Sequence, residues 1–162
     1  MNWPFPPLVL PVIHLTQQRS GDCLVACAGM LLTYAGKSFN YQRVAQQLKT
    51  RDFGTVFSHI RQLTARGVTV LVEHGDIDQL YQELRQNRPC AVAVNTAELP
   101  HWYNDPTHNE EVGHAVVVIG IDAEMVYLND PEFTVAPLRV PLAEFQLARI
   151  DFDELYAVLV VN

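Results

Sequence analysis

The stretch TQQRSGDCLVACAGMLLTYAG, residues 16–36, decides how the rest of the chain is interpreted. A loop of small and polar residues changes there into an apolar run, and Cys23 stands at the change. The run is apolar nearly all round and stops at Gly36, which predicts a buried helix that begins at Cys23. A cysteine that only packs in a core is usually found inside such a run, so this position needs another explanation.

The predicted helix start is a favourable environment for a thiolate. The first N–H groups of a helix lack intrahelical acceptors and form the positive end of its macrodipole. Both effects lower a thiol pKa, which is what nucleophilic catalysis by cysteine requires. Gly21 allows a close approach of the backbone, and Asp22 is a candidate helix cap. The alternative for Cys23 is a small core residue.

The bulk composition indicates a globular protein with one domain. The chain has 162 residues, of which 49% are hydrophobic and 18% charged, so we expect a single domain over residues 1–162. The net charge of -7 argues against binding to nucleic acid or to an anionic membrane surface. No apolar run approaches the length of a membrane span.

The N-terminus and the cysteines bear on the location of the protein. Residues 1–13 are rich in proline and lack a positive leader, which predicts an extended arm packed on the body rather than a secretory signal. The three cysteines are too few and too irregular for a disulfide framework or a zinc site. We therefore expect a reducing compartment, the cytoplasm.

Hydrophobic periodicity predicts helices in the first half and strands in the second. An α+β fold with a largely antiparallel sheet follows from this order. Asn40 is a plausible N-cap, and a break at residues 122–124 joins two strands into a hairpin. The helices are expected at 23–36, 40–49, 55–67, 76–87 and 141–149, and the strands at 68–74, 89–96, 114–122, 125–130 and 154–161.

A histidine and an aspartate lie at the free ends of the predicted hairpin. His114 opens the first strand after Gly113, and Asp130 ends the second strand before a proline. A carboxylate at that place can hold one imidazole nitrogen and leave the other for the thiol of Cys23. This is the arrangement of nucleophile, base and orienting group in a catalytic triad. The alternative is a surface histidine and a turn-forming aspartate.

Two glutamines precede the cysteine in the opening stretch. Gln17 lies six residues before Cys23, and Gln18 lies five before it. A side-chain amide beside the helix start can donate a hydrogen bond to a developing oxyanion, and the backbone N–H of Cys23 can donate a second. The alternative for either glutamine is a solvated side chain.

These motifs together resemble a known family. The sequence from about residue 14 to its end is similar to the papain-like cysteine peptidases that process double-glycine leader peptides of bacteriocins, and most to their stand-alone relatives. The resemblance rests on Gln17, on Asp22-Cys23 before the apolar helix, on Gly113-His114 before Ala-Val-Val-Val, and on Asn129-Asp130-Pro131. It implies a papain-like fold with Cys23 as nucleophile, His114 as base, Asp130 as orienting residue and Gln17, rather than Gln18, in the oxyanion hole.

The resemblance also bears on the substrate. It implies a peptide or protein substrate, possibly a leader peptide, and no cofactor. Members linked to transporters usually have glycine after the nucleophile, whereas this chain has Leu24 and no predicted transporter portion, so a double-glycine substrate does not follow. The residues expected at the substrate-binding cleft are Gly21, Asp22, Trp102 and Gly113. Trp102 is included because loops beside catalytic groups often supply recognition, and the alternative for it is an aromatic residue that only anchors the loop.

The other cysteines and the histidines before His114 are expected to have structural roles. Cys27 and Cys90 are expected in the core. A metal site could be imagined in the loop before His114, but the spacings fit no strong zinc or calcium pattern, so no metal is predicted. The residues of that imagined site are His101, Asp105, His108 and Glu110.

Two other functions are compatible with the same residues. An acyl transferase of the transglutaminase or ligase type would keep the Cys23 thioester and pass the acyl group to an amine. A non-catalytic module of the same fold would bind a peptide without cutting it. A cysteine peptidase is the preferred hypothesis, because the whole catalytic set is present.

Overall fold

The structure is a computed structural model and describes residues 3–108 and 113–162. Its helices are α1 (Cys23–Tyr34), α2 (Tyr41–Gln47), α3 (Ile77–Arg85), α4 (Pro100–Tyr103) and α5 (Leu142–Ile150), with short 3-10 helices η1 (Phe57–Gln62) and η2 (Thr96–Glu98). Its strands are β1 (Leu8–Val9), β2 (Val68–His74), β3 (Cys90–Asn95), β4 (Gly113–Ile121), β5 (Met125–Asn129), β6 (Leu138–Pro141) and β7 (Leu155–Val161). The predicted α+β class is confirmed.

The strands in the described part of the chain form one seven-stranded sheet. The order is β2-β7-β3-β4-β5-β6, with β1 added beside β4, and each pair is antiparallel. All of β3 is buried, and so is β4 beyond Gly113. Both strands are therefore covered on two faces, which explains why their sequences are continuous apolar runs without polar alternation.

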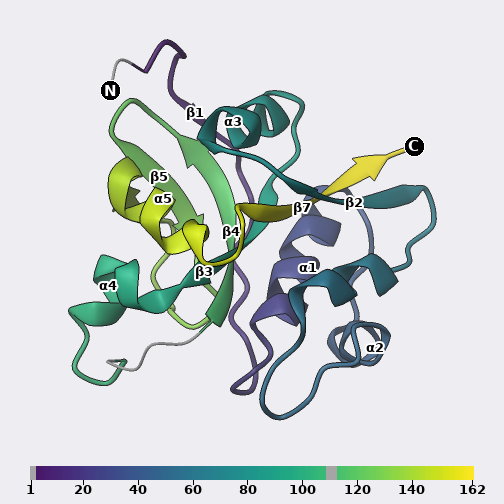
Figure 1. Cartoon of the computed structure of the whole chain (residues 1–162). Helices are drawn as coiled ribbons and strands as arrows, with labels where there is room; N and C mark the ends of the chain where they lie inside the picture. Colours follow the sequence, from purple (N-terminus) through teal and green to yellow (C-terminus); the bar gives the residue numbers. More distant parts are fainter. Residues whose placement is uncertain (1–2, 109–112) are drawn as a thin grey trace.

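Helices cover this sheet from both sides. Figure 1 shows α1 and α2 on one side of β3 and β4, and α4 and α5 on the other. α1 contacts β3, β4 and β7, while α5 contacts β3 and β6. Every residue of α1 from Leu24 to Leu32 is buried, so the helix is the central element of the core. Its predicted start at Cys23 and its stop before Gly36, which has φ +75°, are confirmed.

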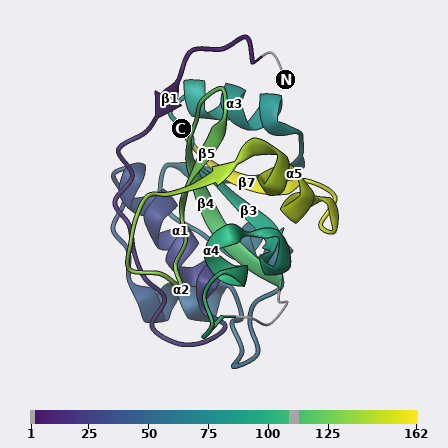
Figure 2. The same ribbon diagram turned by 90° about the vertical axis from the view of Figure 1, so that its left-hand side faces the viewer.

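The N-terminal arm runs along the sheet towards the start of α1 (Figure 2). Leu8 and Val9 pair with β4, where the added Cβ of any other residue at Gly120 would lie 2.8 Å from the Leu8 carbonyl oxygen. Further along, Asn129 donates to the Val12 carbonyl, and His14 Nε2 lies 2.7 Å from the Phe133 carbonyl oxygen. The predicted packing of the arm on the body holds over its described residues, 3–13.

Three secondary-structure predictions differ from the structure. The helix expected at 55–67 is only η1, because Val56 and Leu63 on either side are extended and Gln47 Oε1 accepts from the Thr64 N–H. Pro141 ends β6 and precedes α5, so it is not in the first turn. α4 and β6 were not predicted, since four-residue elements give no clear periodicity.

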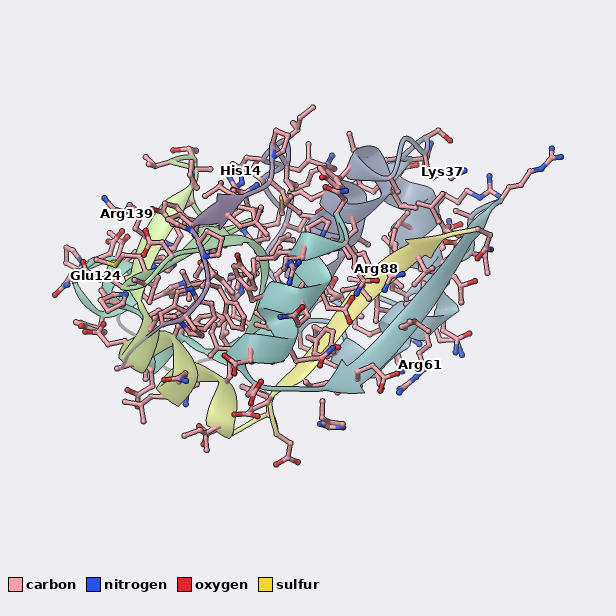
Figure 3. All side chains as sticks on the ribbon, turned by 90° about the horizontal axis from the view of Figure 1, so that it is seen from above. His14, Lys37, Arg61, Arg88, Glu124 and Arg139 are labelled. Carbon is pink, nitrogen blue, oxygen red and sulfur yellow. The ribbon has the colours of Figure 1, made fainter. Side chains whose placement is uncertain are left out.

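Charged side chains lie at both ends of the molecule (Figure 3). Figure 3 shows Lys37 and Arg61 at the end formed by the first helices, and Glu124 and Arg139 at the opposite end, beside β5 and β6.

The described residues include no helix that combines the length and the apolar character needed to cross a membrane.

Candidate active site

Cys23 is the first residue of α1 and lies half-buried at the edge of a cavity. Burial alone would raise the pKa of its thiol. The hydrogen bond and the positive charge of His114, with hydrogen bonds from the backbone N–H groups of Ala115 and Leu24, outweigh burial and lower this pKa. The local field therefore favours the thiolate that a nucleophile needs.

The strand register explains how His114 meets Asp130. β4 pairs Val117 with Asn129, so continuing the register by one residue sets Asp130 opposite Val116. His114 lies two residues further along and on the same face, within reach of a diagonal contact. Its Nε2 is 2.7 Å from Asp130 Oδ1, in a buried environment. The other ring nitrogen, Nδ1, is left for Cys23.

The charges of this histidine and aspartate stabilise each other. Burial alone would lower the pKa of His114, but the charge of Asp130 and the hydrogen bond to it raise the pKa to about 10. Burial alone would raise the pKa of Asp130, but the His114 charge and hydrogen bonds from His101, His114 and Trp102 hold it well below its usual range. The arrangement thus keeps an imidazolium beside an ionised carboxylate.

The Asp130 carboxylate accepts hydrogen bonds on both oxygens. Oδ1 faces His114 Nε2 and accepts from the Glu132 backbone N–H at 3.0 Å. Oδ2 lies 2.7 Å from His101 Nε2 and accepts from Trp102 Nε1 at 2.9 Å. Asp130 is completely buried, so these donors replace the water that its charge has lost.

Trp102 combines two contacts with the candidate triad. Its indole donates to Asp130, and its ring lies edge-on to His114 with centroids 5.0 Å apart. The side chain also lines the cavity, although it is only 7% exposed. Its position therefore fits a support for the histidine and the carboxylate as well as the predicted part of a binding cleft.

Gln17 is tied to the loop that follows Asp130. Its backbone N–H donates to the Pro131 carbonyl at 2.9 Å, and its side chain lines the cavity beside Cys23. Side-chain Nε2 donates to the Arg19 carbonyl at 3.1 Å, which leaves one amide proton. Gln18 instead has an exposed side chain, and its backbone N–H donates to the Tyr41 hydroxyl.

The predicted cap by Asp22 is wrong. Its side chain makes no capping bond, because Oδ2 accepts from the Tyr41 hydroxyl at 2.7 Å and from Arg19 Nε at 3.3 Å. The residue is 1% exposed and lies under these partners, so its carboxylate does not face the cavity as a substrate-binding group would. Its place favours a structural role in the loop before Cys23.

The two glycines expected at the cleft both line the cavity. Gly21 has φ +89°, and an added Cβ would lie 2.8 Å from the Gly54 nitrogen and 2.9 Å from the Asp52 carbonyl oxygen. The turn at 51–54 can therefore approach the loop before Cys23 only because residue 21 is glycine. Gly113 is exposed at the start of β4, and its added Cβ would meet the ring of Phe152.

The cavity has a volume of about 750 Å³ and lies between the helical half and the sheet. Sequence reasoning missed most of its helical wall, which includes Lys49, Arg51, Phe53, Val56 and His59. The turn carrying Phe53 has no chemical motif, and its close approach to Gly21 is a tertiary contact that the sequence pattern does not indicate. The predicted core positions of Cys27 and Cys90 are confirmed, and burial raises the pKa of both thiols well above its usual value.

The imagined metal ligands have other partners. His101 contacts Asp130, and His108 lies between Asp105 and Glu132. Glu110 lies outside the described residues. Within residues 3–108 and 113–162, no group of three or more histidine, cysteine or acidic side chains is placed to hold a metal ion. The contact of His101 with Asp130 was missed, since twenty-nine positions of sequence separate them without a shared motif.

Comparison with known families gives a match over most of the chain. The model of the Peptidase_C39 like family matches residues 9–148, a span that contains the candidate site. Among curated proteins, none matches the chain.

Solved structures share the fold at low sequence identity. A Bacillus anthracis protein described as a C39-like peptidase is 18% identical, with a TM-score of 0.79 over 98% of this chain and 99% of that one. The peptidase domain of the Streptococcus transporter ComA is 18% identical, with a TM-score of 0.69 over 92% and 98%. A double-glycine-motif protease from an AMS/PCAT transporter, solved with a leader peptide, is 17% identical, with a TM-score of 0.66 over 98% and 99%. The predicted papain-like peptidase fold is confirmed by these neighbours.

Proposed function

This chain belongs to the Peptidase_C39 like family, and we propose that it is a cysteine peptidase that cleaves a peptide bond through a thioester on Cys23. One observation carries the proposal. The buried imidazole of His114 lies between the thiol at the start of α1 and the ionised carboxylate of Asp130. This arrangement supplies a nucleophile, a proton carrier and an orienting group in the geometry that acyl transfer requires.

Acylation begins with the Cys23 thiolate. Its sulfur attacks the scissile carbonyl carbon, a C–S bond forms, and the carbonyl electron pair moves onto oxygen. The amide of Gln17 and the backbone N–H of Cys23 donate to this oxyanion. The intermediate collapses, the C–N bond breaks, and the His114 imidazolium gives its proton to the leaving nitrogen. The products are a thioester and a free amine.

Deacylation reverses the direction of proton transfer. Neutral His114 takes a proton from water as the water oxygen attacks the thioester carbonyl. The second tetrahedral intermediate breaks its C–S bond, which releases a carboxylic acid and restores the thiolate–imidazolium pair. Asp130 stays ionised throughout and stabilises the imidazolium.

A peptide is the substrate class that the site favours. The cavity has a volume of about 750 Å³ and is lined by residues from both halves of the protein, which leaves room for a peptide segment beside Cys23. The similar protease from the AMS/PCAT transporter was solved with a leader peptide, and we propose a peptide segment of that general kind here. We place the enzyme in the cytoplasm, because Cys23, Cys27 and Cys90 are free thiols and the nucleophile must stay reduced.

A peptide library tests the proposed function. Wild-type protein and Cys23→Ala are incubated with a random peptide library, and new termini are identified by mass spectrometry. We expect cleavage products with wild type alone, and modification of Cys23 in preference to the buried Cys27 by iodoacetamide. A wild-type protein that cuts nothing and whose Cys23 resists iodoacetamide would overturn the proposal.

A further inference from the structure

His101 is the donor to Asp130 that no catalytic motif accounts for. It lies in α4, where Pro100 occupies the first turn. Its Nε2 is 2.7 Å from Asp130 Oδ2, as short as the contact of His114 with Oδ1. Its side chain is 13% exposed, so the ring sits at the border between the buried carboxylate and solvent.

The chemistry of the carboxylate fixes the role of this nitrogen. Asp130 is ionised, and an ionised carboxylate can only accept hydrogen bonds. Nε2 of His101 must therefore carry a proton and donate it to Oδ2. This bond belongs to the charge-assisted class, which is stronger than a bond between neutral groups.

The ring of His101 is held in place on its other side. It lies edge-on to Phe133, with centroids 5.0 Å apart and an interplanar angle of 79°. The Phe133 backbone N–H donates to the Asp130 carbonyl, so the loop that carries the carboxylate also carries the ring that packs on His101. The imidazole is thus fixed from two directions by one loop.

We propose that His101 is a positioning residue of the candidate triad, which holds Oδ2 of Asp130 so that Oδ1 stays turned towards His114. The terminal torsion of an aspartate is broad, so hydrogen bonds must select the carboxylate plane. Without His101, Oδ2 keeps only the Trp102 indole, and the plane is less well determined. The inference rests on the proposed function in one respect, which is that His114 acts as the catalytic base.

The groups around this contact come from several elements. His114 of β4 and His101 of α4 face Asp130 directly, while Cys23 and Cys27 of α1 interact electrostatically with His114 and Asp130 respectively. His108 lies edge-on to the ring of Trp102, and its Nε2 is 3.1 Å from Glu132 Oε1. A substitution of His101 alone leaves all of these in place.

Asparagine and glutamine at position 101 make a matched pair. The amide of His101→Gln can reach the place of the imidazole Nε2 and donate to Asp130, whereas the shorter amide of His101→Asn cannot. His74→Asn is the control, because His74 is exposed at the end of β2, where its Nδ1 lies 2.8 Å from the Asp153 carbonyl oxygen. Should His101→Asn fail to fold, His101→Phe replaces it, since it keeps a ring against Phe133 and lacks the donor.

Two quantities are measured. The first is the pH midpoint of His114, obtained by NMR of protein labelled with 15N-histidine. The second is the rate at which iodoacetamide alkylates Cys23. We expect His101→Asn to move the His114 midpoint down by about half a pH unit or more, a roughly threefold loss of its proton affinity. Alkylation of Cys23 should slow as well, because a less firmly held imidazolium stabilises the thiolate less. His101→Gln and His74→Asn should stay close to wild type.

Two results would overturn the inference. An unchanged His114 midpoint in His101→Asn would leave His101 a merely structural residue. An upward shift would mean that His101 only withdraws charge from Asp130 without orienting it. Both criteria hold even if no peptide is cleaved, so a failure of the proposed function is distinguishable from a failure of this inference.

Discussion

Nε2 of His114 lies 2.7 Å from Oδ1 of Asp130, and this contact assigns the two nitrogens of the imidazole to different partners. The carboxylate occupies Nε2, and Nδ1 is left for the Cys23 thiol.

The reactivity of Cys23 should depend on His114. In His114→Ala, the hydrogen bond and the charge of the imidazole no longer lower the Cys23 pKa, so burial is opposed only by the backbone hydrogen bonds from Ala115 and Leu24 and the pKa rises. We expect iodoacetamide alkylation at pH 7 to slow by about 10-fold or more, because each unit of pKa changes the thiolate fraction tenfold. Peptide mapping over a range of pH gives the midpoint, and His74→Ala is the control. An unchanged midpoint in His114→Ala would contradict the assignment.

The stability of Cys23→Ser should depend on pH. His114 has a raised pKa when folded, so its contribution to the free energy of unfolding is complete below about 6.5 and is lost as pH rises towards 10. In wild type, Cys23 has a lowered pKa and opposes this loss, because its thiol gives up a proton at a lower pH in the folded state than in the unfolded state. Urea unfolding at several pH values should therefore show a steeper alkaline decline in Cys23→Ser than in wild type. Equal declines would argue against the ion pair.

Asp130→Asn should abolish catalysis and weaken the fold. An amide NH₂ cannot accept from the donors that now converge on both carboxylate oxygens, so at least one of them loses its partner. We expect peptidase activity to fall by about 10³-fold or more, by comparison with other triads. Thermal melting should also show a lower Tm. Retention of activity within an order of magnitude would exclude Asp130 as the orienting residue.

The neighbouring glutamines offer an internal comparison. Gln17→Ala should lower kcat about 10²-fold with little change in KM, because an oxyanion donor acts on the transition state. Gln18→Ala should have no such effect, since its side chain is exposed. Iodoacetamide alkylation of Cys23 forms no oxyanion and should proceed normally in both variants. Equal kcat values for the two variants would remove Gln17 from the oxyanion hole.

Alanine substitutions at two glycines with positive φ should distinguish the cost of backbone strain from the cost of a steric clash. Gly21→Ala combines φ +89° with a Cβ less than 3 Å from the turn at 51–54, whereas Gly36→Ala at φ +75° meets nothing within 4 Å. Gly36→Ala should cost about 1 kcal/mol of stability from strain alone. Gly21→Ala should cost more and should also slow alkylation of Cys23, because its loop must move. Equal costs in urea unfolding would show that the contact with the turn is unimportant.

Much of the candidate site was predictable because its residues stand at element boundaries. Cys23 begins an apolar helix, and His114 and Asp130 end the two strands of a hairpin, so periodicity and a short turn bring them together. The helix cap at Asn40 was likewise predictable from local sequence, and its side chain accepts the expected bond from the Arg43 backbone N–H.

The remaining contacts depend on long-range packing that a single sequence does not encode in an obvious way. Asp22 precedes a helix and looks like a cap, yet Tyr41 and Arg19 compete successfully for its carboxylate. His101 reaches Asp130 only because α4, a helix too short to predict, turns it inward. The turn at 51–54 likewise joins the cavity through its fit against Gly21.

The contacts of the N-terminal arm affect when the candidate site forms during synthesis of the chain. His14 contacts Phe133, and Val12 contacts Asn129, across separations of 119 and 117 residues. Contacts of such long range form late in folding, because the intervening loop must close first. Cys23 leaves the ribosome well before His114 and Asp130 and has neither an imidazole nor a settled oxyanion loop at that stage. A nascent chain is therefore expected to carry Cys23 without its partners, and under the proposed function the site would be complete only once the sheet has received the arm.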